Sequence, residues 1–484
     1  MQWVTEPDGE RAFWLHGVAG SGKSTVANTI TSMYTETGLL GASFRFNQHI
    51  DPKFLFRNIT YQLALFDSRY RERLLQAFRK HGTMASYSLR EQLERFIIEP
   101  MDAICFVGPV VIVIDGVDEN GVEDERREVL EAISKGLPNL PSFVRVLVTS
   151  RYERDIRAKL ASVSFQKSIN ETKGVATDIL TYIDDRMQDV VNSHTYLEAH
   201  WPGSHAKWNL ASRADGLFIW VKVASEYIKA SLDPNQALDD VLHGQATIAQ
   251  GPEAPLDSLY LKILQRTSVL LSSIEATRYV LGSILVTKTP LTQTGLDSLL
   301  GLGKNVVQTL QDGSRIRLTS SASLIDALGS IMRVDNKGIV RVLHASIVDF
   351  FTNPNRCTDV RFFIDRSLYS HQLAICCFNA MDGLKQDICA INDPTKFNSE
   401  IIDLDERLNK HLPEHLQYAC RSWHWHLAEI TESSDVYNRV KGFLFTHLLH
   451  WIEVMSLLDD IDSIYPALGY MKSWLQVCSA SGCC

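Results

Sequence analysis

One eight-residue segment near the start of the chain constrains the fold more than any other feature. Residues 17–24 run Gly-Val-Ala-Gly-Ser-Gly-Lys-Ser and fit the pattern G-x-x-x-x-G-K-[ST]. Glycines let successive backbone N–H groups turn inward without an obstructing Cβ, which creates a cradle for phosphate. The pattern needs a strand before the loop and a helix after it. An apolar run at 12–15 and a helical pattern at 24–34 supply both, so we expect a phosphate-binding loop here.

The pattern assigns a role to each part of this loop. Lys23 is expected to reach the β- and γ-phosphates of a triphosphate, and the Ser24 hydroxyl to hold Mg²⁺. The N-terminal dipole of the following helix favours the same negative charge. The nucleotide-binding residues predicted in this segment are Gly17, Val18, Ala19, Gly20, Ser21, Gly22, Lys23, Ser24 and Thr25.

An acidic segment follows the longest apolar run of the chain. Residues 110–114 predict a strand that is buried on both faces, and Asp115 lies at its carboxyl end, where it can hold Mg²⁺ through water. Glu119 is the candidate for polarising an attacking water molecule, with Asp118 as the alternative. Together with the loop, these carboxylates predict nucleotide hydrolysis. The other interpretation is an acidic loop that caps the next helix.

Arg151 follows another predicted strand, at residues 145–150. A guanidinium at this strand end can sense the γ-phosphate, because its planar charged fork matches phosphate oxygens. We therefore count Arg151 with Glu119 and Asp118 as candidate catalytic residues. The other interpretation is a surface arginine after a buried strand.

The pattern of strands and helices changes along the 484 residues, which suffice for two to four domains. In the first part of the chain, strand-like segments alternate with helical ones. Besides the strands already named, strand-like segments lie at 41–46 and 164–169. This alternation predicts a parallel sheet with helices on both faces. Later segments are helical, except for a hairpin signal at 331–343 that follows three helices, as in a winged helix. The expected domains are a P-loop α/β nucleotide-binding domain at 1–172, a helical domain at 173–250, a winged-helix-like domain at 251–355 and an all-α C-terminal region at 356–484.

Two local expectations accompany this division. A turn-rich break at Gly251-Pro252 separates the helical and winged-helix-like domains, and the polar stretch 312–323 fits no element well. In the C-terminal region, broad apolar faces predict helices over 362–381, 416–427 and 443–458.

Composition limits the partners of the chain. Its net charge of 48 − 57 = −9 argues against a nucleic-acid-binding surface. Its nine cysteines are scattered without zinc spacing, which indicates buried free thiols in a reducing compartment. No signal peptide is visible, and the apolar run at 110–114 is too short to span a bilayer. We therefore expect a cytoplasmic protein without a membrane partner.

Several of these segments resemble the NACHT type of signal-transducing P-loop ATPase, of the STAND class, and in particular its large fungal set, whose nucleotide module is also described as nephrocystin-like. The resemblance is most specific at 13–30, 110–119 and 148–151, and the D-G-x-D-E form at Asp115–Glu119 is the NACHT version of the second nucleotide motif. Further likenesses extend it along nearly the whole chain. They lie at residues 61–64, 214–220, 256–260, 341–346 and 362–427.

The resemblance implies a nucleotide switch. In that family ADP holds the modules closed, whereas ATP opens them and permits self-association, with effector or sensor protein domains acting in cis or in trans. His344 matches a winged-helix histidine that touches the β-phosphate of ADP in relatives, so we add it to the nucleotide-binding residues. The other interpretation is a core histidine at the end of the hairpin, whose hydrogen bonds are all made within the protein. The implied ligands are ATP or ADP with Mg²⁺, the implied activity is slow hydrolysis, and the implied setting is fungal self/non-self recognition or cell death.

Departures from the family leave alternatives open. Residues 216–220 lack the proline that lies near adenine in many relatives, so GTP stays an alternative to ATP. The chain begins about ten residues before its first predicted strand and carries neither an effector domain nor a repeat sensor, which suggests a truncated form, a natural short form or a bare switch. The alternative function is a scaffold that holds a nucleotide without turnover. A small-molecule kinase is a weaker alternative, because the sequence shows no arginine-rich lid.

Overall fold

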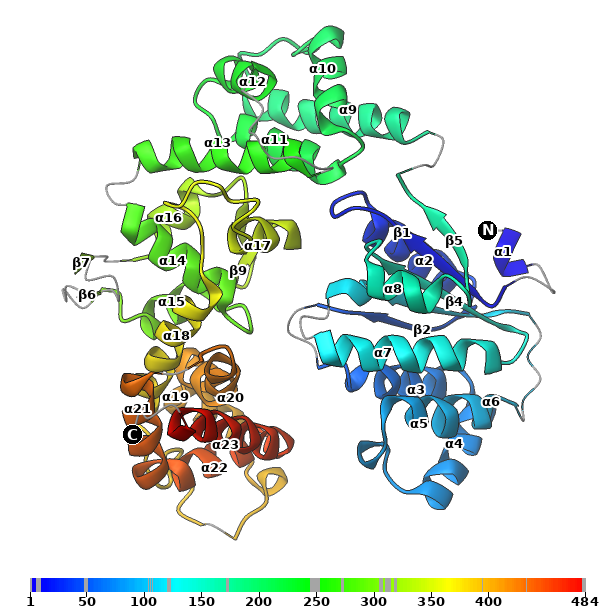
Figure 1. Ribbon diagram of the computed structural model, residues 1–484, viewed down its shortest axis with the longest axis vertical. Coiled ribbons are helices and arrows are strands. Elements are labelled where there is room, and N and C mark those ends of the chain that lie inside the picture. Colours follow the sequence, from blue (N-terminus) through cyan, green and yellow to red (C-terminus); the bar gives the residue numbers. More distant parts are fainter. Residues whose placement is uncertain are drawn as a thin grey trace. The chain divides into compact units, whose positions relative to one another are not determined.

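In the computed structural model, the chain forms two compact units, residues 1–222 and 223–484, which are described separately (Figure 1). The predicted break at Gly251-Pro252 lies outside the described residues, and the four-domain division stays a prediction. The structure describes residues 2–5, 10–47, 51–102, 104, 106, 108–119, 123–170, 174–243, 253–270, 274–303, 308–309, 315–316, 320–393, 395–431 and 433–480.

The first unit contains a five-stranded sheet in the order β2-β3-β4-β1-β5. Every neighbouring pair is parallel, which confirms the predicted parallel sheet. Each strand falls within one or two residues of its predicted position. The strands are β1 (Ala12–His16), β2 (Leu40–Arg45), β3 (Val110–Asp115), β4 (Val144–Ser150) and β5 (Phe165–Ser168).

Helices cover both faces of this sheet, because successive side chains of its central strands enter two separate cores (Figure 1). On β3, Ile112 packs in the core that holds Phe56 of α3, whereas Val113 packs in the core that holds Ala27 of α2. The helices of this unit are α1 (Gln2–Thr5), α2 (Lys23–Glu36), α3 (Phe54–Phe66), α4 (Ser68–His81), α5 (Leu89–Leu93), α6 (Glu99–Asp102), α7 (Glu123–Gly136), α8 (Arg154–Leu160), α9 (Val175–Ser193), α10 (Ser204–Ala214) and α11 (Phe218–Lys229), within which the division falls. The unit also has three short 3-10 helices, η1 (Met84–Ser86), η3 (Val117–Glu119) and η4 (Leu137–Asn139), and one π-helix among the described residues, η2 (Glu94–Ile98).

The second unit is built from helices and short hairpins. The predicted hairpin is present, since β8 (Met332–Val334) pairs antiparallel with β9 (Val340–Val342), and Asp335 Oδ1 accepts from the backbone of Lys337 at 2.9 Å within the turn. The winged-helix assignment stays a prediction. The other elements are α12 (Pro234–His243), α13 (Ala254–Leu270), α14 (Ile274–Val286), α15 (Gln293–Leu299), β6 (Gln308–Thr309), β7 (Arg315–Ile316), α16 (Ala322–Ala327), α17 (Ala345–Thr352), α18 (Arg366–Met381), η5 (Asn398–Glu400), α19 (Leu404–His411), α20 (Glu414–Ala428), α21 (Ser434–Thr446), α22 (Leu448–Leu457), η6 (Ile461–Ser463) and α23 (Ile464–Ala480).

Two expectations for this unit were wrong. The apolar pattern over 443–458 predicts one helix, but α21 ends before His447, whose backbone leaves the helical region at φ −121° and ψ −4°, and α22 begins after it. The polar stretch 312–323 contributes β7 and the start of α16, although 312–314 and 317–319 lie outside the described residues. Two-residue strands and short helices leave no periodic pattern for a sequence to reveal.

Two expectations from composition concern thiols and membranes. The cysteines that the structure shows as free thiols lie in the second unit, and burial raises the pKa of Cys376 and of Cys420 to about 12, which keeps both thiols protonated. Among the residues described, no helix combines the length and the apolar character needed to cross a bilayer.

A charged cluster joins three helical segments of the second unit. The Glu429 carboxylate accepts from Lys288 Nζ at 2.5 Å and from Arg366 Nη2 at 3.2 Å, and Ser370 Oγ donates to its other oxygen. Burial alone raises the pKa of Glu429, but the charges of Lys288 and Arg366 outweigh burial and hold it at about 2. The cluster therefore favours the ionised carboxylate and ties α20 to α18 and to the residues after α14.

We predict that Glu429→Gln lowers the free energy of unfolding by roughly 1–3 kcal/mol at pH 7. Because the folded-state pKa lies below the ordinary value of 4.5, the stabilisation is present above pH 4.5 and is lost as pH falls toward 2. Urea unfolding at pH 7 and at pH 3 measures the difference. The exposed Glu406→Gln is the control, and an equal loss in both variants would contradict the role of the cluster.

Candidate functional site

The candidate site lies at the carboxyl edge of the parallel sheet. Strand β1 leads into the loop of residues 17–24, β3 ends at Asp115, and β4 leads to Arg151. Carboxyl ends of parallel strands meet at one edge, which is where such sheets bind ligands. Ser24 Oγ donates to Asp115 Oδ1 at 3.1 Å, across 91 positions of sequence. The structure therefore brings the predicted loop and the predicted acidic segment together.

The loop has the backbone expected of a phosphate cradle. Gly20 and Gly22 have φ of +78° and +97°, which side-chain-bearing residues adopt only at a cost. Lys23 Nζ donates to the carbonyl oxygens of Gly17 and Val18, each at 2.9 Å, so its ammonium lies over the loop. Burial lowers the pKa of Lys23. The nearby carboxylates raise it, but burial has the larger effect.

The remaining predicted loop residues line the same turn. Ala19 and Ser21 are buried, and Ser21 Oγ donates to the carbonyl of Val18 at 2.9 Å. Ser24 and Thr25 lie in the first turn of α2, with Thr25 exposed. The helix therefore starts where the loop ends, as the pattern requires.

Two elements that the sequence did not link to the loop hold it in place. Asn170, after β5, accepts from the Val18 backbone N–H at 3.2 Å. Ile219, in the first turn of α11, donates its backbone N–H to Gly20 O at 3.2 Å, and a Cβ built on Gly20 would lie 1.9 Å from Ile219 Cγ2. Asn170 follows a predicted strand, and residues at the carboxyl ends of parallel strands line the binding edge, so the sequence held a signal for it. No local signal marks Ile219.

Asp115 has the surroundings of a metal-binding carboxylate. It is 3% exposed, and its Oδ1 accepts from the hydroxyls of Ser24 and Thr149. Its Oδ2 is buried and makes no hydrogen bond, and the nearest cationic atom described is Arg45 Nε at 3.4 Å. Such an oxygen beside the Ser24 hydroxyl fits Mg²⁺, which takes few protein ligands and keeps waters and phosphate oxygens. Among the described residues, no group of three or more His, Cys, Asp or Glu side chains suited to a metal occurs.

The two candidate general bases have different partners. Asp118 Oδ1 accepts from the Arg151 backbone N–H at 3.0 Å, and Asp118 Oδ2 lies 3.1 Å from Arg151 Nε. Both oxygens of Asp118 are thus engaged by one residue. Burial, followed by the charge of Asp118, raises the pKa of Glu119 to about 7. A carboxyl group with a pKa near neutrality suits proton transfer, which favours Glu119 over Asp118 as the base.

His344 belongs to the second unit, where it caps α17. Its Nδ1 accepts from the Ser346 backbone N–H at 3.1 Å and lies 2.8 Å from Ser346 Oγ. A backbone N–H only donates, so Nδ1 holds no proton in this bond. The contact of His344 with a nucleotide stays a prediction.

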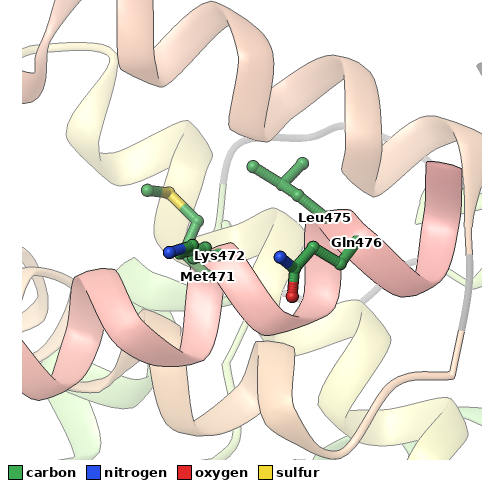
Figure 2. A pocket seen from close by; sticks show the side chains of 4 residues that line it. All are labelled: Met471, Lys472, Leu475 and Gln476. Atoms are coloured by element: carbon green, nitrogen blue, oxygen red, sulfur yellow. The ribbon is translucent and has the colours of Figure 1, made fainter.

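A hollow of about 510 Å³ opens over α23 in the second unit (Figure 2). Its lining comes from Met471, Lys472, Leu475 and Gln476, which project from this one helix. A binding site normally gathers several converging polar groups, and Lys472 is the one charged group of this lining. The carboxyl edge of the sheet is therefore the better candidate.

The fold and the site define the class of the first unit, a parallel α/β unit whose glycine-rich loop faces a cluster of carboxylates. Residues 1–151 match the family model described as Nephrocystin 3, N-terminal. The match runs through β1, the loop, the acidic segment and Arg151, so this part of the chain is similar to a nephrocystin-like N-terminal domain. No curated protein matches the chain.

We predict that Gly20→Ala destabilises the protein by about 3 kcal/mol even without a ligand, because the methyl group meets Ile219 and the backbone has positive φ. Gly38→Ala is the matched control, since Gly38 has φ of +69° and a Cβ added there would meet nothing within 4 Å. It should cost only about 1 kcal/mol, for the backbone alone. Equal losses in denaturant unfolding would show that the contact between the loop and α11 contributes nothing.

Proposed function

We propose that the protein is a nucleotide-binding switch of the NACHT type, which binds ATP or ADP with Mg²⁺ and hydrolyses ATP slowly. One observation carries the proposal: the glycine-rich loop with Lys23 and Ser24 lies against Asp115 at the carboxyl edge of the sheet, with Ser24 Oγ 3.1 Å from Asp115 Oδ1. This is the arrangement that a phosphate-binding loop and a Mg²⁺-holding strand end require. The match of residues 1–151 to a nephrocystin-like model and the D-G-x-D-E sequence of Asp115–Glu119 support the NACHT assignment.

The proposed binding step uses the loop and the first turn of α2. Inward N–H groups of the loop and the dipole of α2 favour a polyphosphate, and Lys23 exchanges its bonds with Gly17 and Val18 for phosphate oxygens. Ser24 and Asp115 would hold Mg²⁺, which neutralises charge on the phosphates when bound. Among NTPs we favour ATP over GTP on family resemblance alone.

The proposed hydrolytic step uses Glu119 and Arg151. Glu119, with a pKa of about 7, accepts a proton from the attacking water, and burial next to other carboxylates is the cause of that pKa. Arg151 Nε lies 3.1 Å from Asp118 Oδ2 and would exchange this partner for a phosphate oxygen. The exchange gives the guanidinium the role of a sensor for the γ-phosphate.

The proposed output is a change in conformation followed by self-association or binding of a partner protein. By family resemblance, the His344 imidazole would donate a hydrogen bond to the β-phosphate of ADP. Partners in this scheme are effector or sensor domains. The cytoplasm is the proposed location, in keeping with the free thiols of the chain, and fungal self/non-self recognition or cell death is the setting that the resemblance suggests.

Removal of the loop lysine tests binding. We expect ATP and ADP to bind in the micromolar range or tighter, and Lys23→Ala to weaken binding about 10- to 100-fold through the loss of a charge-assisted contact. Equilibrium binding of a fluorescent ATP analogue measures the change, and chromatography of released nucleotide identifies what co-purifies. Lys441→Ala is the control, because Lys441 is exposed on α21. If the protein bound neither nucleotide and Lys23→Ala changed nothing, the proposal would fail.

The pH dependence of turnover tests the role of Glu119. The base is active as a carboxylate, so kcat/KM for ATP should rise up to tenfold per pH unit below pH 7 and level off above it, following a pKa of about 7. Glu119→Gln should lower kcat about 10²- to 10⁴-fold with binding retained. Asp118→Asn is the comparison, because it removes the partner of Arg151 and leaves the base.

The Glu119→Gln variant also separates the switch from the alternative, a scaffold that holds a nucleotide without turnover. A scaffold keeps the Lys23-dependent binding but has no turnover to lose, so Glu119→Gln would be silent. The raised pKa of Glu119 favours the hydrolytic switch, since strongly perturbed carboxyl groups gather at functional sites.

A further inference from the structure

Arg45 stands beside the candidate metal-binding carboxylate. It is the last residue of β2 and pairs in register with Asp115, the last residue of β3. Its Nε lies 3.4 Å from Asp115 Oδ2. The Arg45 side chain is 57% exposed, whereas that of Asp115 is 5% exposed. One partner of this ion pair is thus fixed and buried, and the other reaches in from solvent.

The buried carboxylate of Asp115 needs a positive partner, because an ionised group loses most of its hydration on burial. Its Oδ1 accepts from two hydroxyls, but its Oδ2 has no hydrogen bond. The two other cations of the site are engaged elsewhere. Lys23 Nζ bonds to loop carbonyls at 2.9 Å, and Arg151 pairs with Asp118 at 3.1 Å. Arg45 is therefore the cation that faces Oδ2.

The contact between Arg45 and Asp115 is loose. It is made through Nε at 3.4 Å rather than through a bidentate fork, and the guanidinium is mostly hydrated. An ion pair with one exposed partner is worth little, so the arginine leaves at small cost. A divalent cation at Oδ2 would need the same space and would bind the carboxylate more strongly.

We propose that Arg45 is a removable counter-ion of Asp115, which neutralises this carboxylate until Mg²⁺ binds and then turns out toward solvent. The proposal deepens the proposed function and rests on it in one respect, namely that the arriving cation is the Mg²⁺ of a bound nucleotide. Because two cations compete for one oxygen, Arg45 weakens Mg²⁺ binding, and Mg²⁺ loosens Arg45 by the same factor. Arg45 is in this sense a positioning residue, which sets the Mg²⁺ concentration at which the site fills.

The Mg²⁺ dependence of nucleotide binding tests the proposal. A fluorescent ATP analogue is held at fixed concentration while MgCl₂ is titrated into the full-length protein. Arg45→Gln should lower the Mg²⁺ concentration at half-saturation about three- to tenfold, the factor expected for loss of one partly exposed competing charge. Arg45→Lys, which keeps the charge, should shift it less. Arg71→Gln, on the exposed side of α4, is the matched control and should not shift it.

A second measurement needs neither nucleotide nor Mg²⁺. Thermal unfolding in EDTA is compared for the wild type, Arg45→Gln, Asp115→Asn and the double variant. Arg45→Gln should lower the melting temperature of the wild type but not that of the Asp115→Asn variant, because the pair is already broken there. Additive effects would overturn the pairing.

The two measurements separate the possible failures. An unchanged or higher Mg²⁺ midpoint in Arg45→Gln, with nucleotide bound normally by the wild type, would overturn the counter-ion role and leave the proposed function standing. A wild type that binds no nucleotide would overturn the proposed function. In that case a non-additive cycle in EDTA would still support Arg45 as the counter-ion of Asp115.

Discussion

The buried carboxylate of Asp115 is the constraint on which the site depends. An ionised group with 3% exposure must be compensated by its neighbours. Compensation comes from three different elements, namely Thr149 on β4, Ser24 on α2 and Arg45 on β2. The register of β2, β3 and β4 and the position of α2 therefore meet at one side chain. A shift of any of them by one residue would remove one partner from a buried charge.

The three acids at this edge of the sheet differ in their partners. Asp118 is bound on both oxygens by Arg151, whereas Asp115 accepts from two hydroxyls on Oδ1 and faces Arg45 with Oδ2. Glu119 lies in the field of both carboxylates, and burial with that field raises its pKa to about 7. Three acids within five positions of sequence thus differ in environment, and this difference fits the roles proposed for them, namely a metal-binding group, a positioning group and a base.

The sequence predicted those parts of the fold and the site that depend on local pattern. The β-branched run at 110–114 indicated a strand buried on both faces, and the glycine spacing at 17–24 indicated the loop before α2. Contacts that depend on tertiary structure escaped prediction. Arg45 meets Asp115 only because β2 pairs with β3, and Ile219 reaches Gly20 from 199 positions away, 219 − 20. The break at His447 lies in an apolar run whose period does not change, so no pattern marks it.

Two separate constraints require glycine at position 20, one from the loop and one from tertiary packing. The loop needs glycine there for a φ of +78°, whatever the rest of the chain does. In this protein the first turn of α11 also packs on Gly20, with the backbone N–H of Ile219 on its carbonyl and the Ile219 side chain where a Cβ would stand. Local pattern accounts for the first requirement alone. The second couples the position of α11 to the conformation of the loop, so any rearrangement of the loop must be accommodated by α11.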